Sequence, residues 1–303
     1  MAHGSVLSVN LLTADADAQA WVNAMHAAIA ASGMVQTSDT GQMASPYTGA
    51  KPTGTLATMG YEIWRMNDTQ QANFPIYLKI EYGSNNSAAT GAAWFITIGT
   101  GTNGAGTITG TLLARTNMAR NGTPPAGTFE QVASAGEGYF CMCQGLGALN
   151  WAGFFCLQRH IDVNGDPTDD AIFVYFPSTT NVNWHTLMKQ PGGLLIGRQS
   201  GASGVGPPVL YNPENTNASE VVSLGGEVPL YPFEPFLGRR QAPLLGSCVV
   251  HADDVGAGVV FTATMFGSTK TWRRVSDASN AHTRGGSSVA STSKTALALR
   301  WET

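Results

Sequence analysis

Charged side chains are scarce in this chain of 303 residues. Lys and Arg number 16 and Asp and Glu number 20, which together make 12% of the sequence. An ordinary soluble domain carries roughly 25%. Apolar residues make up 43% of the chain, which is enough to build a core and excludes disorder over most of its length. The net charge of −4 argues against a dedicated nucleic-acid-binding protein, which would present a basic surface.

Cysteine is also scarce, with only four residues. That number is too small for a disulfide scaffold in a chain of this length. The first residues lack the basic segment and the apolar run of a secretory signal, so we expect synthesis in a reducing cytoplasm. Residues 138–158 are uncharged and long enough to cross a bilayer, but they contain four glycines and three side-chain amides. Two strands around a turn are therefore expected there, and no membrane span.

Complete catalytic motifs are missing. Gly99 to Gly104 spells G-x-G-x-x-G after an apolar run, but the Thr- and Gly-rich continuation lacks the helix that dinucleotide binding requires. We expect a hairpin connection instead. The sequence contains no G-x-S-x-G elbow, Walker A loop or H-E-x-x-H motif. The only His–carboxylate cluster, His251 with Asp253 and Asp254, is explained by a turn at a strand end. We assign no catalytic or cofactor-binding residue.

A calcium loop is only half present. Asp162, Asn164 and Asp166 match the first three ligand positions of an EF-hand loop. The glycine and the bidentate glutamate that should follow are replaced by Pro167 and Phe173. A polar loop between hairpin strands is the better interpretation.

The cysteines could in principle hold zinc. Cys141 and Cys143 would share one face of a strand, and Cys156 or His160 could join them. No C-x-x-C pair accompanies them, however. Buried thiols that pack as small hydrophobic groups are the favoured interpretation, so we assign no metal ligand.

Aromatic residues leave the function open. Buried cores, subunit interfaces and sugar-binding platforms all use tryptophan. The paired carboxylates of a glycan hydrolase are recognised only by their geometry, so such an enzyme also stays an alternative. The seven tryptophans are dispersed along the chain: Trp21, Trp64, Trp94, Trp151, Trp184, Trp272 and Trp301.

One helix is expected near the start. Thr13 can cap it, Asp15 and Asp17 suit the positive end of its dipole, and Gly33 can end it. The spacing of its small and apolar residues predicts one face that packs closely on another surface. That face consists of Ala14, Ala18, Trp21, Met25 and Ala28.

Beyond residue 58 the pattern changes to the two-residue alternation of β-strands. The runs are short and bounded by Gly, Asn, Ser or Pro, which is typical of an antiparallel sandwich or barrel. We therefore predict a mainly β fold with a short N-terminal helix. Strands are expected at 61–66, 76–82, 94–98, 107–114, 137–143, 151–161, 171–176, 247–251, 258–266, 269–275 and 297–301.

Composition divides the chain into four parts. Residues 1–58 hold the helix and a linker, and 59–176 form the antiparallel β core. Nine of the fifteen prolines lie in 177–243, so we expect a long irregular Pro/Gly-rich arm or loop region there. Residues 244–303 should pack as strands on the core or on a neighbouring subunit.

Charge is polarised along the chain. Residues 1–238 carry a net charge of −8, whereas residues 239–303 carry +4. A head-to-tail assembly could use this polarity, because the basic end of one subunit would meet the acidic body of the next. A solvent-exposed surface with no role in assembly would show the same charge difference.

The chain resembles the virion structural proteins of tailed bacteriophages. The resemblance is carried by Gly60–Asp68, Pro75–Gly83 and Trp94–Gly106 and covers about residues 55–175. It implies a homo-oligomeric tail, collar or fibre-attachment subunit without catalytic residues. Its partners would be copies of itself and other virion proteins, with no nucleic acid and no membrane. The alternatives are an adhesin domain that binds a receptor or host surface glycan, and a glycan hydrolase.

Overall fold

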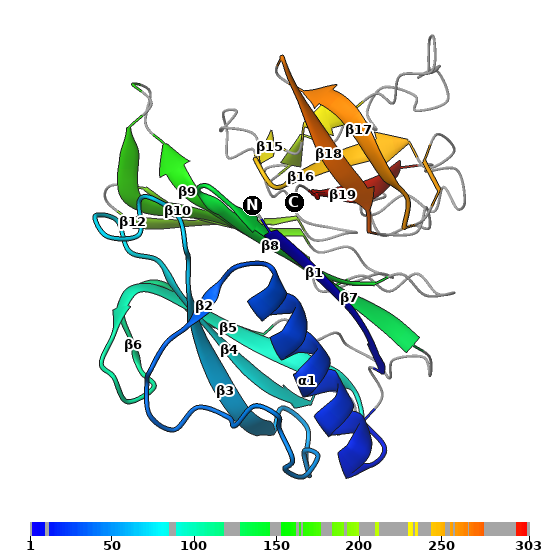
Figure 1. The fold of residues 1–303 in the computed structure, drawn as a ribbon. Helices are drawn as coiled ribbons and strands as arrows, with labels where there is room; N and C mark the ends of the chain where they lie inside the picture. Colours follow the sequence, from blue (N-terminus) through cyan, green and yellow to red (C-terminus); the bar gives the residue numbers. More distant parts are fainter. Residues whose placement is uncertain are drawn as a thin grey trace.

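The computed structural model of the chain describes most of its first 176 residues and parts of the remainder (Figure 1). The described residues are 2–9, 12–84, 89–117, 128–145, 153–161, 164, 166–176, 184–190, 193–199, 210–211, 230–232, 234–235, 244–251, 255–256, 258–265, 267–275 and 295–301. Within these ranges the protein is mainly β, with antiparallel sheets and the single helix α1 (Asp15–Ala31).

The N-terminal sheet has five antiparallel strands in sequential order. Each strand pairs with the next along the chain, and a longer connection, residues 37–57, joins β2 to β3. Its strands are β2 (Val35–Gln36), β3 (Thr58–Arg65), β4 (Tyr77–Ser84), β5 (Ala92–Thr102) and β6 (Ile108–Asn117).

The central sheet has seven strands in the order β1-β7-β8-β9-β10-β11-β12. Strand β1 comes from the start of the chain and pairs antiparallel with β7, which lies more than a hundred residues later. The strands are β1 (Ala2–Val9), β7 (Thr128–Gly136), β8 (Tyr139–Gly145), β9 (Gly153–Ile161), β10 (Pro167–Phe176), β11 (Trp184–Gln190) and β12 (Gly193–Gln199).

The C-terminal sheet has the order β14-β16-β19-β18-β17. A separate two-stranded pair joins β13 (Leu210–Tyr211) to β15 (Glu234–Pro235). The strands of the C-terminal sheet are β14 (Leu230–Pro232), β16 (Ser247–His251), β17 (Val260–Met265), β18 (Ser268–Arg274) and β19 (Thr295–Arg300).

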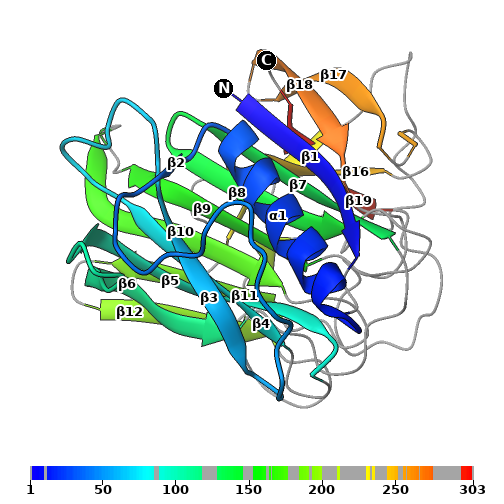
Figure 2. The same ribbon diagram turned by 60° about the horizontal axis from the view of Figure 1, so that its bottom comes forward.

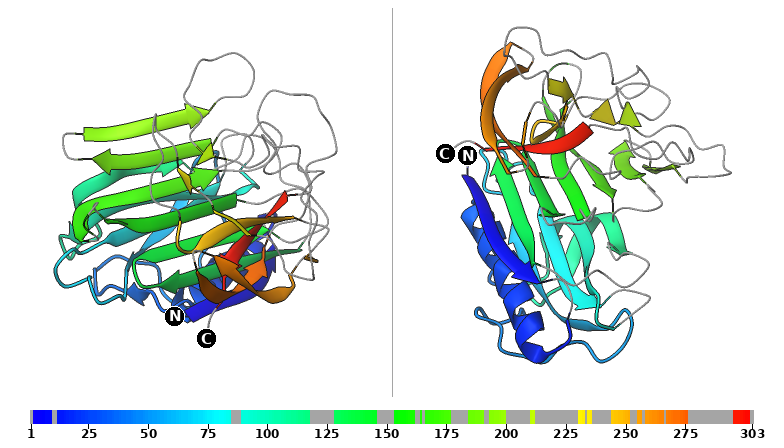
Figure 3. Two further views of the ribbon diagram at one scale, coloured as in Figure 1. Left: turned by 90° about the horizontal axis from the view of Figure 1, so that it is seen from above. Right: turned by 90° about the vertical axis from the view of Figure 1, so that its right-hand side faces the viewer.

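The three sheets stack as layers, with the central sheet in the middle (Figures 1 and 3). Alternation along β8 explains why this sheet is covered on both faces. Phe140 and Met142 belong to the core shared with the N-terminal sheet. On the other face, Tyr139 and Cys141 lie under the C-terminal unit, where both approach Gly246. A strand buried on both faces has no position for a charge, which accounts for the uncharged run in the sequence.

Helix α1 fills the space between the N-terminal sheet and the β1–β7 end of the central sheet (Figures 1 and 2). Trp21 meets the ring of Tyr82 edge-on, at 5.5 Å between centroids. Gly4 of β1 lies against the backbone of Ala28, so close that a methyl group there would overlap the helix. Away from α1 the two sheets contact each other directly, and Trp94 of β5 packs on Phe155 of β9.

Most predicted elements are confirmed. The helix ends at Ala31, and Gly33 follows its C-cap Ser32 with a positive φ of 90°. The G-x-G-x-x-G stretch forms the end of β5 and the turn into β6. The cap differs from the prediction. Residue Ala14 occupies the N-cap, and the Thr13 hydroxyl instead donates to the Asp17 carboxylate at 2.6 Å.

Strands β1 and β7 are not predicted from the sequence, and the segment expected to be irregular contains further strands. Two of them, β11 and β12, form a hairpin that extends the central sheet. Their sequences carry short apolar runs on either side of Pro191 and Gly192, which is an ordinary hairpin pattern. The high proline content of 177–243 as a whole concealed this local signal. The remaining residues of that segment lie outside the described ranges.

Candidate functional site

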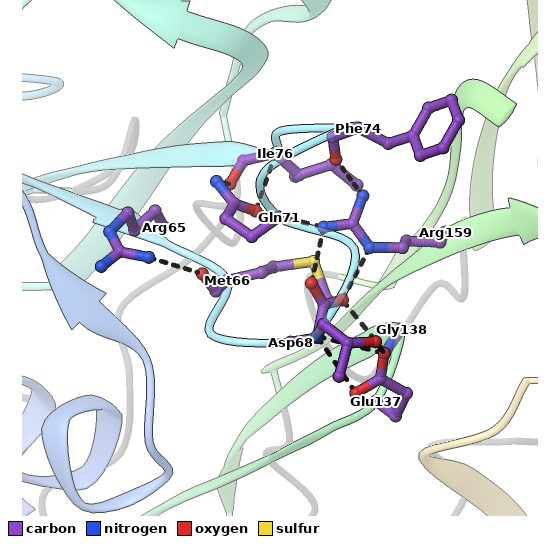
Figure 4. Close-up of polar contacts among 10 residues, drawn as sticks. Arg65, Met66, Asp68, Gln71, Phe74, Ile76, Glu137, Gly138 and Arg159 are labelled. Atoms are coloured by element: carbon purple, nitrogen blue, oxygen red, sulfur yellow. Dashed lines mark hydrogen bonds and ion pairs between the residues drawn. The ribbon is translucent and has the colours of Figure 1, made fainter. Parts of the chain in front are cut away.

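A dense group of polar contacts lies where the β7–β8 turn and β9 of the central sheet meet the connection that follows β3. We call Asp68, Gln71, Glu137 and Arg159 the Arg159 cluster (Figure 4). Arg159 points from β9 toward the N-terminal sheet, on the same side as Leu157 of the main core. Its side chain and that of Asp68 are each only 1% exposed, so this ion pair is removed from water.

The geometry of the Arg159 cluster is bidentate. The Arg159 Nε and Nη2 atoms donate to the two carboxylate oxygens of Asp68 at 2.6 and 2.8 Å. Nη2 also donates to Gln71 Oε1 at 3.1 Å, and Nη1 donates to the Phe74 carbonyl. Such fork-to-fork pairs are stronger and more specific than single contacts.

The β7–β8 turn completes the cluster from the other side. The Gly138 amide donates to Asp68 Oδ2 at 3.1 Å, and the exposed Glu137 carboxylate accepts from the Thr69 amide at 3.2 Å and from its hydroxyl. The central sheet and the β3–β4 connection are therefore held together at two adjacent points.

A cavity of about 300 Å³ lies beside the Arg159 cluster. The C-terminal end of α1, the end of β3 and the β7–β8 turn line it. Neither Asp68 nor Arg159 reaches its wall. The principal ion pair therefore faces protein, whereas only Glu137 borders the cavity. This arrangement suits a clamp between layers better than a reaction centre. The residues that contribute most of the wall include Ser32, Met34, Met66, Asn67, Glu137 and Tyr139.

A second buried carboxylate lies between α1 and the N-terminal sheet. Glu62 is 1% exposed and accepts hydrogen bonds from the Tyr82 hydroxyl at 2.5 Å and from Trp64 Nε1 at 3.3 Å. His26 of α1 places its Nδ1 atom 2.6 Å from Glu62 Oε1. The hydrogen bond to Glu62 raises the pKa of His26, against the opposing effect of burial. Burial, followed by the nearby Glu62 charge, raises the pKa of Tyr82 far above its ordinary value.

A third polar junction joins the C-terminal sheet to the central sheet. Arg273 of β18 donates to Glu130 of β7 at 2.7 Å, and Ser5 of β1 donates to the same carboxylate. The Trp301 ring stacks on His3 at 3.7 Å between centroids and lies 4.8 Å from the Arg273 guanidinium. The two ends of the described chain are therefore packed against each other.

The cysteines that suggested zinc do share one face of the central sheet. Cys141 and Cys156 lie directly opposite each other on β8 and β9, and Cys143 is on the same face of β8. All three are fully buried, and Cys143 makes a 3.7 Å contact with the Val275 carbonyl. Among the described residues, no three His, Cys, Asp or Glu side chains converge as a metal site would require.

Some residues of the other candidate sites that the sequence suggested lie outside the described ranges. Asn164 and Asp166 lie in the β9–β10 connection, while Asp162 is outside the described residues. His251 ends β16, and Asp253 and Asp254 are likewise outside. Four tryptophans are core residues, and Trp301 is partly exposed on His3. The four in the core are Trp21, Trp64, Trp94 and Trp272.

The chain was compared with protein-family models, with curated proteins and with solved structures. None of them matches it. Within the described ranges, no helix combines the length and apolar content that a membrane span needs.

Sequence reasoning missed the Arg159 cluster and the Glu62 site, although each left a signal. Arg159 is the first charge after the uncharged residues 138–158, and it follows the apolar residues 154–157 of the same strand. Glu62 stands on the same side of its strand as Trp64. A lone charge among core positions predicts a buried, paired side chain, but only the fold identifies the partner.

Proposed function

We propose that the protein is a structural subunit of a tailed-bacteriophage particle, a homo-oligomeric tail, collar or fibre-attachment component that works through contacts between subunits. The observation that carries this proposal is the combination of a stacked, layered β body with two neighbouring sheet edges, β6 and β12, that pair with no further strand among the described residues. It agrees with the expectation that the resemblance in residues 55–175 raises.

Two of the outer sheet edges lie on the same side of the molecule. Strand β6 ends the N-terminal sheet and β12 ends the central sheet, and within the described ranges no further strand pairs with either. Both edges lie on the side opposite α1 and β1 (Figures 2 and 3). An unpaired edge presents backbone N–H and C=O groups to another chain and is a ready template for β-strand addition. Two such edges on one side suit a subunit whose copies add to each other.

The use of charge supports the same proposal. Asp68, Glu62 and Glu130 each bind groups of another element or layer of the same chain. These buried carboxylates therefore hold the body together. Charged residues make only 12% of the chain, and the cores of subunit interfaces are likewise depleted in charge.

Particle composition tests the proposal. We expect peptides of this chain in the mass spectrum of purified phage particles, at a copy number that is a multiple of a ring or trimer. We also expect portal, terminase or fibre genes beside its gene. Particles that contain none of the chain, together with flanking genes of unrelated metabolism, would overturn the assignment. An enzymatic or adhesive role would then take precedence.

A further inference from the structure

We propose that Cys141 and Cys156 form a reversible modification site, a dithiol in the central sheet that closes into a cross-strand disulfide under oxidising conditions. The inference goes beyond the proposed function and does not depend on it, because it rests only on the pairing of β8 with β9. In the structure both cysteines are free thiols.

The strand register places these two residues face to face. Cys141 is the direct partner of Cys156, and their sulfur atoms are 2.7 Å apart. The Arg159 amide donates to the Gly138 carbonyl at 2.8 Å, which marks those two residues as a hydrogen-bonded pair. Since hydrogen-bonded and non-hydrogen-bonded pairs alternate along an antiparallel ladder, Cys141 and Cys156 form a non-hydrogen-bonded pair.

A non-hydrogen-bonded pair has the geometry that a disulfide needs. Opposite Cα atoms in such pairs are about 4.5 Å apart, and their side chains approach each other closely. Disulfide-linked residues have Cα atoms about 4.4–6.8 Å apart. The bond can therefore form without a shift in the register of β8 against β9.

No other pair of cysteines is aligned in this way. The partner of Cys143 across the ladder is Phe154. Cys248 belongs to β16 of the C-terminal sheet and faces Pro232 and Ala298 in its own ladders. The structure therefore selects one of the possible pairings among four cysteines.

The oxidant is a peroxide, and the reaction balances as follows. One thiolate attacks hydrogen peroxide, which yields a sulfenic acid and one molecule of water after protonation of the leaving hydroxide. The second thiol then attacks the sulfenic sulfur, the S–S bond forms and a second water leaves. Two sulfurs are oxidised by two electrons in total, and both peroxide oxygens are reduced to water.

Burial controls the rate of this reaction and protects its product. Both sulfurs are fully buried, and burial raises the pKa of the Cys141 thiol well above its ordinary value. Because the thiolate is the reacting form, we expect slow oxidation in hours rather than seconds. The same burial hinders reduction by glutathione. The bond would also tie β8 to β9 across the 14 residues between them, which should raise the thermal midpoint by about 5 °C or more.

The experiment counts thiols in the full chain. The reduced protein is exposed to hydrogen peroxide, unfolded in guanidinium with N-ethylmaleimide, and analysed by intact mass and by non-reducing peptide mapping. We expect four labelled cysteines before oxidation and two afterwards, with one linked peptide pair that contains Cys141 and Cys156. A reductant should restore four.

Variants separate this pair from general cysteine oxidation. Cys143→Ser, on the same strand and equally buried, should still lose two labelled thiols and gain thermal stability on oxidation. Cys141→Ser and Cys156→Ser should keep all their labelled thiols and gain no thermal stability on oxidation. Four labelled cysteines in the oxidised wild type, or a linked pair that includes Cys143 or Cys248, would overturn the inference. The wild-type map decides the question even if a variant fails to fold.

Discussion

Among the described residues, each buried charge contacts a specific partner from another segment of the chain, and the Arg159 cluster is the clearest case. Arg159 lies on the face of β9 that belongs to the main core, where an unpaired guanidinium would be very costly. Asp68 supplies the neutralising charge, and Gln71 and the Phe74 carbonyl satisfy the remaining donors. Three residues of one connection are thus fixed against the central sheet.

Removal of the Asp68 charge should therefore be strongly destabilising. The substitution Asp68→Asn leaves Arg159 buried without a counter-ion, and we expect the free energy of unfolding to fall by about 3–5 kcal/mol. Urea unfolding followed by tryptophan fluorescence would measure it. The control is Glu81→Gln, which breaks the ion pair with Arg115, a side chain 48% exposed. Solvated pairs of this kind contribute about 0–1 kcal/mol. Equal losses in the two variants would contradict the assignment of a buried clamp.

The contact between His26 and Glu62 makes stability depend on pH. Because the folded state raises the pKa of His26 above 6.5, protonated His26 stabilises the fold. This contribution is complete below the unfolded-state pKa and is lost as pH rises through the folded-state value. We expect the free energy of unfolding to decrease between about pH 6 and pH 8, as measured by urea titrations across that range.

The matched variant for this prediction is His26→Gln. It retains a side chain that can donate to Glu62 but does not titrate, so the decrease between pH 6 and pH 8 should become smaller. A variant whose pH profile coincides with that of the wild type would show that another group carries the dependence.

At the scale of elements, the approach of α1 to β1 depends on one small residue. Gly4 has no Cβ, and a methyl group there would overlap the Ala28 carbonyl and come within 2.8 Å of the Ala31 Cβ atom. Gly4→Ala should lower the free energy of unfolding by about 1–3 kcal/mol, because either the helix or the strand must shift.

Gly54 offers the matched control for Gly4. A Cβ atom at Gly54 would meet nothing within 4 Å, and its φ is not in the left-handed region. We expect Gly54→Ala to change stability by less than about 0.5 kcal/mol. Thermal unfolding of both variants by circular dichroism compares them. A Gly4→Ala variant as stable as Gly54→Ala would contradict the close packing of α1 on β1.

The sequence predicts local elements well and long-range pairing poorly. Alternation is clear in β3, β4 and β5, whose inner faces are apolar apart from Glu62 of β3, so these strands and their hairpins follow from the pattern. Strands β1 and β7 pair across more than a hundred residues, and β7 carries Glu130 and Gln131 at its centre. The Glu130 carboxylate is acceptable there because Arg273 and Ser5, both from distant segments, donate hydrogen bonds to it. No local pattern encodes such a partner.

The candidate site shows the same limit. Arg159 and Glu62 stand at core positions of predicted strands, which is enough to expect buried charges. Their partners cannot be read from the sequence. Asp68 contacts Arg159 because of the way the β3–β4 connection packs, and His26 contacts Glu62 because of the way α1 packs. The register of Cys141 against Cys156 likewise depends on the length of the β8–β9 connection, which the sequence leaves open.

For the molecule as a whole, part of the charge polarity between residues 1–238 and 239–303 serves contacts within one chain. The sequence suggested that the basic end of one subunit could meet the acidic body of another. In the structure, Arg273 of the basic end binds Glu130 of the body of the same chain. Part of this polarity therefore stabilises the stack of three sheets. For contacts between copies, the proposal therefore relies on the edges of β6 and β12.

Oligomeric state is the most direct test of the account, measured by size-exclusion chromatography with light scattering at micromolar concentration. We predict a defined multiple of the 31.7 kDa chain mass. Thr109→Lys with Thr111→Lys, at exposed positions of edge strand β6, should shift the population toward the monomer, because edge lysines oppose strand addition. Thr53→Lys with Thr55→Lys adds the same charge at the same spacing in an exposed connection and should leave the mass unchanged. A wild-type protein that stays monomeric throughout, without any assembly partner, would contradict the central claim.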